Sequence, residues 1–172
     1  MTDSPAAEPR LVSPWLLAAL AILVLLMLAL ARPEMGRMAR DLVSGKPSDL
    51  SISYLDAWLR VQPDSPRLQE ILARQYLGLG RWDDAYRAAV RLDAIGDATT
   101  RQAAMRLQVR AVAQKTFEHP VSDPERTVQK SRLIKLLHDL AGRDMDVPTM
   151  AYLAGTAYSI GAGGVSLVLY RR

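Results

Sequence analysis

The chain has 172 residues, of which 49% are hydrophobic and 23% are charged, and its formal net charge is +4 at pH 7. This balance excludes an intrinsically disordered chain, which would carry too few hydrophobic residues to build a core. The sequence contains no cysteine, so disulfide bonds and thiolate metal sites are excluded as well.

An uncharged and mostly aliphatic segment covers residues 11–31. About 20 apolar residues are needed to cross the hydrocarbon core of a bilayer, which is about 30 Å thick. Trp15 lies at one end of the segment, where an indole ring favours the membrane interface. The sequence therefore predicts a short tail over residues 1–13 and a transmembrane helix over residues 14–32, through which the chain would bind the membrane.

A cleaved signal peptide is the competing interpretation of this segment, because residues 29–31 read Ala-Leu-Ala, the small-residue pattern of a cleavage site. The segment is long for a signal peptide, and Arg32 and Pro33 would directly follow the cut, so an uncleaved anchor is favoured. A buried core helix is disfavoured, since a helix that is apolar on every side needs much more surrounding protein.

The basic residues near the predicted span indicate one orientation of the chain. Arg10 precedes the span, whereas several basic residues follow it within or beside a predicted linker over residues 33–47. Because Lys and Arg accumulate on the cytoplasmic side of a span, this count places the rest of the chain in the cytoplasm. The basic residues on the C-terminal side are Arg32, Arg37, Arg40 and Lys46.

The clearest helix of the remaining chain is predicted to begin at Pro66. Ser65 before it is typical of a helix start, because a hydroxyl caps backbone N–H groups and proline has no N–H to leave unpaired. Apolar residues then recur at helical spacing. Gly78 and Gly80 are predicted to end this helix, since glycine accepts the left-handed conformation of a helix terminus.

A second helix is predicted from Trp82 to the region of Gly96. Ala85 and Ala89 lie on its apolar stripe, and such small side chains allow two antiparallel helices to approach closely. Two short helices with a connection of a few residues form a helical hairpin. A single hairpin cannot bury its apolar face alone, so neighbouring hairpins are expected to stack on it.

Weaker helical patterns flank this pair. Residues 50–61 have the apolar pattern of a second helix, which places the first helix of a preceding pair near residues 30–45. Downstream, residues 99–117 are helical in pattern, and Ser122 and Glu125 have the spacing of a capping box before the next apolar stripe. These patterns predict that further helices continue the stack in both directions.

Pro148 is predicted to open another pair, so residues 48–172 are interpreted as an all-α solenoid of antiparallel helix pairs. The last apolar helix, over residues 165–170, lacks the polar cap that solenoid ends normally carry. The sequence therefore favours a protein truncated at its C-terminus. The alternative is a short final helix that docks on a partner or on a membrane.

Residue patterns for catalysis or metal binding are not found in the sequence. His119 and His138 are the only histidines, and neither has a partner at the spacing of a metal site or a catalytic pair. Asp144 and Asp146 are interpreted as turn residues, because a calcium loop needs more oxygen ligands. Residues 161–164 lack the Lys and Ser/Thr of a phosphate loop. We predict no enzymatic activity, no cofactor and no metal site.

Basic and acidic residues alternate along the predicted helices, which is more typical of a solvated surface than of a phosphate-binding patch. Aromatic residues are not interleaved with basic ones as they are in proteins that bind single-stranded nucleic acids. Nucleic acid is therefore not expected as a partner.

The region from 49 to 97 resembles the tetratricopeptide repeat superfamily, whose signature positions carry Leu72, Ala73, Tyr76, Gly80, Trp82, Ala85 and Ala89 in a 34-residue register. The resemblance implies a protein-binding groove lined by the first helices of successive hairpins. By register, the positions facing that groove would be Arg67, Glu70, Arg74 and Leu77. The sequence departs from the family pattern at Leu92 and Asp97, which interrupts the register of the next hairpin.

A predicted span followed by Tyr54-Leu55-Asp56-Ala57-Trp58-Leu59-Arg60 and Leu72-Ala73-Arg74-Gln75-Tyr76 also resembles the start of the PelB family of Pel-type exopolysaccharide export proteins. This resemblance implies a single-pass protein of the bacterial inner membrane with periplasmic repeats, which serves biofilm formation. Its partners would be other proteins of an envelope or polysaccharide export complex, and an anionic or amino-sugar polymer.

Two other functions remain open. The basic residues after the span favour a membrane adaptor that faces the cytoplasm, in secretion or envelope assembly. An accessory protein of a lyase or transferase would need a polar cluster in a pocket, which the sequence does not indicate. The resemblance to the export proteins is preferred over both.

Overall fold

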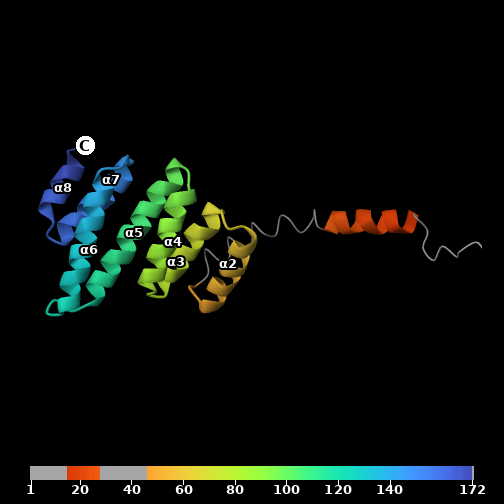
Figure 1. The fold of residues 1–172 in the computed structure, drawn as a ribbon, viewed down its shortest axis with the longest axis horizontal. Coiled ribbons are helices and arrows are strands. Elements are labelled where there is room, and N and C mark those ends of the chain that lie inside the picture. Colours follow the sequence, from red (N-terminus) through yellow and green to blue (C-terminus); the bar gives the residue numbers. More distant parts are fainter. Residues whose placement is uncertain (1–14, 28–45, 172) are drawn as a thin grey trace, which may run out of the picture. The chain divides into compact units, whose positions relative to one another are not determined.

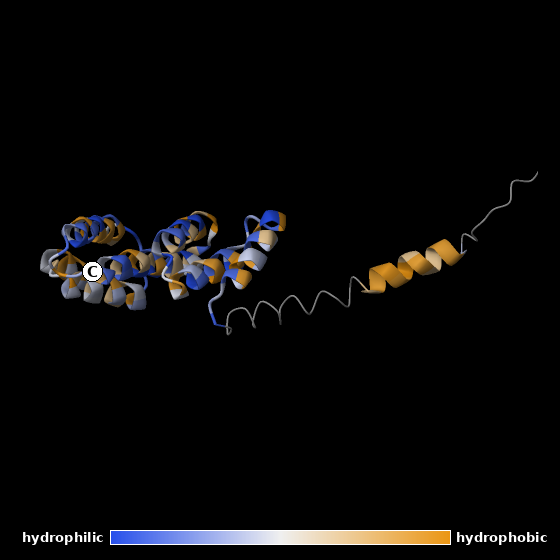
Figure 2. Cartoon of the chain, turned by 90° about the horizontal axis from the view of Figure 1, so that it is seen from below, coloured by the Kyte–Doolittle hydropathy of each residue, from blue (hydrophilic) through white to orange (hydrophobic). Residues whose placement is uncertain are grey.

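The structure is a computed structural model, which describes residues 15–27 and 46–171. The chain divides into two compact units, Met1–Gly45 and Lys46–Arg172. In the first unit, residues 15–27 form a helix whose side chains are all exposed, and Figure 2 shows that this helix is hydrophobic along its described length. The predicted tail over 1–13 lies outside the described residues.

No helix within the described parts of the chain combines the length and the apolar character that a membrane crossing requires. The predicted span over residues 14–32 continues past the described helix at both of its ends, so the remainder of this prediction lies outside the described residues. The same holds for most of the predicted linker over 33–47 and for the helix expected near 30–45. The membrane anchor therefore stays a prediction.

The second unit consists of helices, and its described residues contain no strand, which confirms the predicted all-α class. Seven helices follow one another along the unit in chain order (Figure 1). They are α2 (Asp49–Val61), α3 (Pro66–Gly78), α4 (Trp82–Ile95), α5 (Ala98–Glu118), α6 (Pro124–Ala141), α7 (Val147–Ser159) and α8 (Gly163–Tyr170).

The helices pack as successive pairs. α3 packs on α4, α5 on α6, and α7 on α8, as short connections between antiparallel helices require. Between pairs, α4 packs extensively on α5, α3 also contacts α5, and α5 contacts α7, while α6 contacts α8 on the other side. The unit is therefore a two-layered stack of helical hairpins, and one layer consists of the first helices α3, α5 and α7.

The sequence predicted the first hairpin closely. α3 begins at Pro66 and α4 begins at Trp82, and the alanines expected at their contact, Ala85 and Ala89, are buried. Gly80 has a φ of 71°, the left-handed conformation that ends α3. The Ser65 side chain, however, forms no capping hydrogen bond, and Ser65 contributes through its backbone carbonyl, which accepts a hydrogen bond from the N–H of Gln69.

Two glycines give a matched test of this backbone. Gly80→Ala is expected to lower the free energy of unfolding by roughly 1 kcal/mol, because an L-residue is strained at positive φ. Gly155→Ala is expected to raise it by roughly 0.5–1 kcal/mol, since Gly155 is exposed inside α7 and its added methyl group would have no neighbour within 4 Å. Urea unfolding followed by circular dichroism measures both changes, and equal signs would contradict the described conformations.

The second hairpin is longer than the first, since α5 has 21 residues and α6 has 18. Aspartates cap both helices: Asp97 accepts a hydrogen bond from the backbone N–H of Thr100, and Asp123 accepts one from that of Glu125. The expected capping box of Ser122 and Glu125 does not form, because Asp123 is the N-cap of α6. A carboxylate is the stronger acceptor here, since it also favours the positive end of the helix dipole.

A hydrophobic core of the unit lies between α5, α6, α7 and α8. Leu133, Leu137 and Leu140 project from α6 into it, as the apolar stripe of this helix predicted. α7 contributes small and medium side chains, which let it lie close to α5 and α8. The α7 residues buried in this core are Leu153, Ala154 and Ala157.

Asp83 ties three helices together on the surface. Lys115 of α5 donates a hydrogen bond of 2.6 Å to the Asp83 carboxylate, and Arg132 of α6 lies 3.6 Å from the same carboxylate. The hydrogen bond from Lys115 is the largest cause that lowers the pKa of Asp83 below its ordinary value. The ionised form is therefore stabilised in the folded protein.

This pKa shift has a sign that can be measured. A carboxylate with a lowered folded-state pKa stabilises the fold above its unfolded pKa of about 3.9, and this contribution is lost as the pH falls through the folded pKa. Asp83→Asn should lower the free energy of unfolding at pH 6 by less than about 1 kcal/mol, because solvent screens a half-exposed pair. The two proteins should converge in urea titrations at acidic pH, and a difference that grows on acidification would contradict this assignment.

Candidate ligand-binding groove

The register predicted four groove-facing residues on α3. Arg67 and Arg74 are exposed, whereas Glu70 and Leu77 are partly buried. Arg74 forms an ion pair with Glu70 one turn earlier on the same helix. Of the four residues, Arg74 lines a cavity together with residues of α5 and α7, and the other three do not.

This cavity, here called the basic groove, runs across the layer formed by the first helices of the hairpins. Its volume is about 380 Å³, which lies near the lower end of the range for pockets that bind small ligands. α3 supplies one side, α5 the floor and α7 the other side. Its lining residues are Arg74, Ala103, Arg106, Leu107, Arg110 and Tyr152.

Helical spacing explains how α5 shapes the groove. Ala103, Arg106, Leu107 and Arg110 are three or four residues apart, so they share one face of the helix. The small side chain of Ala103 and the buried side chain of Leu107 form an apolar floor. The long side chains of Arg106 and Arg110 can extend over this floor while their guanidinium groups remain in water.

The arginines of the groove are mostly unneutralised. Arg74 shares its charge with Glu70, but neither Arg106 nor Arg110 forms an ion pair within the described residues. The residues that line the groove include no carboxylate. The groove therefore presents net positive charge, in a form that pairs with carboxylates in two-pronged hydrogen bonds.

Tyr152 adds an aromatic and polar edge. Burial among its neighbours raises the pKa of Tyr152, and the charge of Arg110 and a hydrogen bond with Thr156 oppose that effect. The net direction is upward, so the phenol stays protonated at neutral pH. Tyr152 can therefore donate a hydrogen bond and pack its ring against an apolar group of a ligand.

The residues that line the groove supply ionic, hydrogen-bonding and apolar contacts. Arginine is a poor general base because it does not lose its proton in proteins, and the lining contains no Ser, His, Asp, Glu or Lys that could pair as nucleophile and base. Elsewhere in the described residues, no cluster of three or more His, Asp or Glu side chains is placed to hold a metal ion.

Five of the six lining residues were not predicted from sequence to face a groove: Ala103, Arg106, Leu107, Arg110 and Tyr152. The repeat register stops at Asp97, and α5 exceeds the helix length of the first hairpin by about two turns, so the register could not be carried forward. The signal that could have found the α5 residues is the pair of arginines four positions apart beside Ala103 and Leu107. Tyr152 has no comparable local signal.

Other residues considered in the sequence have structural positions. His119 ends α5, and its Nδ1 lies 3.0 Å from Oδ2 of Asp123. His138 is exposed on α6. Asp146 caps α7 by accepting a hydrogen bond of 2.9 Å from the backbone N–H of Thr149, so it is a helix cap rather than the turn residue that was predicted.

Comparison with known proteins assigns no family to this chain. No protein-family model matches the sequence, and neither the curated proteins nor the solved structures contain a match.

Proposed function

We propose that this protein is a membrane-anchored helical-repeat scaffold whose basic groove binds an acidic segment of a partner protein in an envelope assembly. The observation that carries the proposal is the basic groove, in which two arginines without an ion pair flank an apolar floor and a tyrosine. The stacked hairpins supply a rigid support for such a groove, as they do in other repeat proteins.

The lining of the groove favours an acidic peptide over a sugar polymer. Leu107 and Ala103 offer an apolar surface beside the guanidinium groups, and a peptide with alternating acidic and apolar side chains satisfies both. A uniformly anionic polysaccharide would use the charges and leave the apolar floor exposed. An amino-sugar polymer is disfavoured, because its protonated amines would meet Arg106 and Arg110.

The setting in the cell is proposed from the first unit and from the resemblance noted above. A helix whose described residues are apolar and exposed is suited to membrane insertion when it belongs to a longer apolar segment. The resemblance to Pel-type export proteins favours an inner-membrane protein with periplasmic repeats. In that setting the scaffold would hold partner proteins of exopolysaccharide export during biofilm formation.

The groove is tested with a labelled peptide that alternates glutamate and leucine. Fluorescence anisotropy with the full chain should detect binding of this peptide, and the matched peptide with glutamine in place of glutamate should bind much more weakly. Affinity should fall steeply when salt shortens the Debye length from about 10 Å to about 3 Å. Equal binding of the two peptides would overturn the proposal. Tighter binding of alginate than of either peptide would also overturn it, because the ligand of the groove would then be an anionic polymer.

The orientation is tested with a reporter enzyme fused after residue 97, which is active only outside the cytoplasm. An active fusion of uncleaved size supports the periplasmic scaffold. An inactive fusion supports the second candidate, a cytoplasm-facing adaptor, which the basic residues after the predicted span favour. An active fusion of reduced size would show that the apolar segment is a cleaved signal peptide and not an anchor.

A further inference from the structure

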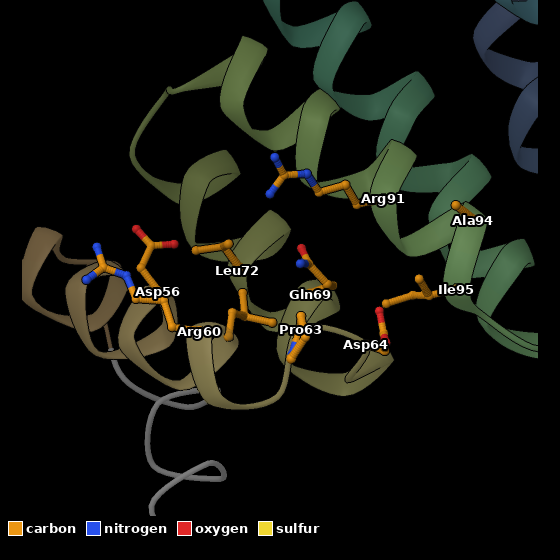
Figure 3. A pocket seen from close by; sticks show the side chains of 10 residues that line it. Asp56, Arg60, Pro63, Asp64, Gln69, Leu72, Arg91, Ala94 and Ile95 are labelled. Atoms are coloured by element: carbon orange, nitrogen blue, oxygen red, sulfur yellow. The ribbon is translucent and has the colours of Figure 1, made fainter.

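A second cavity lies where α2, α3 and α4 meet. It has a volume of about 510 Å³ and is separate from the basic groove, with which it shares no lining residue. Figure 3 shows its side chains, with Asp56 on the α2 side and Arg91 extending from α4. We call it the α2–α4 pocket; its lining residues are Asp56, Leu59, Arg60, Pro63, Asp64, Gln69, Leu72, Arg91, Ala94 and Ile95.

The pocket follows from the way α2 joins the stack. α2 packs extensively against α3, whereas α4 packs against both α3 and α5. Since α2 makes no comparable contact with α4, the two helices stand apart over the face of α3. Leu72 and Gln69 of α3 are buried and form the inner wall of the opening.

Charges of both signs surround this opening. Asp56 and Arg60 come from α2, Asp64 from the loop after it, and Arg91 from α4. None of these four residues forms an ion pair within the part of the chain that the structure describes. Two carboxylates and two guanidinium groups are thus available around one apolar pocket.

Gln69 places a polar atom on the inner wall of the pocket. Its side chain is only 4% exposed, and its Oε1 atom is buried without a hydrogen-bond partner. Buried amide oxygens are nearly always paired. In Figure 3 the Gln69 amide lies on the α3 side, near Arg91. An N–H donor brought into the pocket by a ligand could pair with this oxygen after a small rotation of the side chain.

We propose that the α2–α4 pocket binds a small zwitterionic ligand with an apolar body, of the class of free dipeptides. Its ammonium group would face Asp56, and its carboxylate would face Arg91. Leu59, Leu72 and Ile95 are the apolar wall against which its side chains would pack. The balanced charges select against a simple anion or cation, since each would meet both an attractive and a repulsive group.

The probe for this pocket is dileucine, which has an ammonium, a carboxylate and two apolar side chains. Three capped forms serve as comparators: the N-acetyl form, the C-amide form and the form with both caps. Isothermal titration calorimetry on the full chain in a nonionic detergent should give the highest affinity for free dileucine. Removal of either charge should weaken binding by about tenfold or more, as the loss of a charge-assisted hydrogen bond predicts.

Arg91→Gln separates the two ends of the ligand. It should weaken binding of free dileucine and of the N-acetyl form, and leave the C-amide form unchanged, because that form has no carboxylate for Arg91 to hold. Arg101→Gln, on an exposed arginine of α5 outside the pocket, is the matched control and should change none of these affinities. Unaltered thermal unfolding of both variants shows that they are folded.

The results that overturn the proposal are equally definite. If free dileucine bound no better than the doubly capped form, the charged groups would contribute nothing and only apolar contact would remain. Absence of binding by all four compounds would show that the pocket is a solvated surface feature. Equal weakening by Arg91→Gln and Arg101→Gln would show that net charge, and not the pocket, controls binding.

Discussion

Replacement of Leu133 by alanine is expected to lower the free energy of unfolding by about 2–5 kcal/mol. Leu133 is completely buried in the core between α5, α6, α7 and α8. Removal of its branched end would leave a void in a region where four helices meet. Because small domains have total stabilities of about 5–15 kcal/mol, this single change could remove a large part of the stability of the unit.

Val128→Ala is the control for this prediction. Val128 lies on the same helix but is 59% exposed, so its truncation should alter stability by about 0.5 kcal/mol or less. Chemical unfolding followed by far-ultraviolet circular dichroism compares the two variants. If both variants lost the same small amount of unfolding free energy, Leu133 could not be the buried core residue of α6 described above.

The double substitution Arg106→Glu and Arg110→Glu is expected to reduce binding of the acidic–apolar peptide by about 100-fold or more. Each charge-assisted hydrogen bond contributes about 1.5–3 kcal/mol, and 1.4 kcal/mol corresponds to a factor of ten. The new glutamates would also repel the peptide. Fluorescence anisotropy of the labelled peptide measures the change.

The control for charge reversal is Arg101→Glu with Lys135→Glu, which changes the net charge of the protein by the same amount. Both residues are exposed and lie outside the basic groove. Their reversal should affect affinity only slightly at moderate salt, where charges beyond about 10 Å are screened. Comparable losses in the two double variants would mean that the peptide responds to overall charge rather than to the groove.

The limits of α3 and α4 could be predicted because their signals are local. Pro66 fixes a helix start through its own ring, and Gly80 ends α3 because the chain there adopts a φ that few other residues accept. The close approach of α3 and α4 was also predictable, since Ala85 and Ala89 repeat on one face. Each of these inferences depends on neighbours within about one helical turn.

The groove was predicted only in part because it depends on distant segments. Arg74 was found by counting within one hairpin, whereas Arg110 and Tyr152 are 42 residues apart in the numbering and meet only after α5 and α7 pack. The length of α5 is set by its contacts with four other helices, which no local pattern records. The choice of Asp123 over Ser122 as cap likewise depends on the path of the chain between α5 and α6.

The attachment of α2 has a consequence for how the unit opens in solution. Among the described residues, α2 has one extensive helix contact, with α3, whereas α5 contacts α3, α4, α6 and α7. Release of α2 therefore breaks one interface, and its free energy lies below that of global unfolding. Backbone amides of α2 should exchange with deuterium before those of α5, and a compound held between α2 and α4 should slow that exchange. The exchange rate of a single helix then measures occupancy of the pocket, without any label on the ligand.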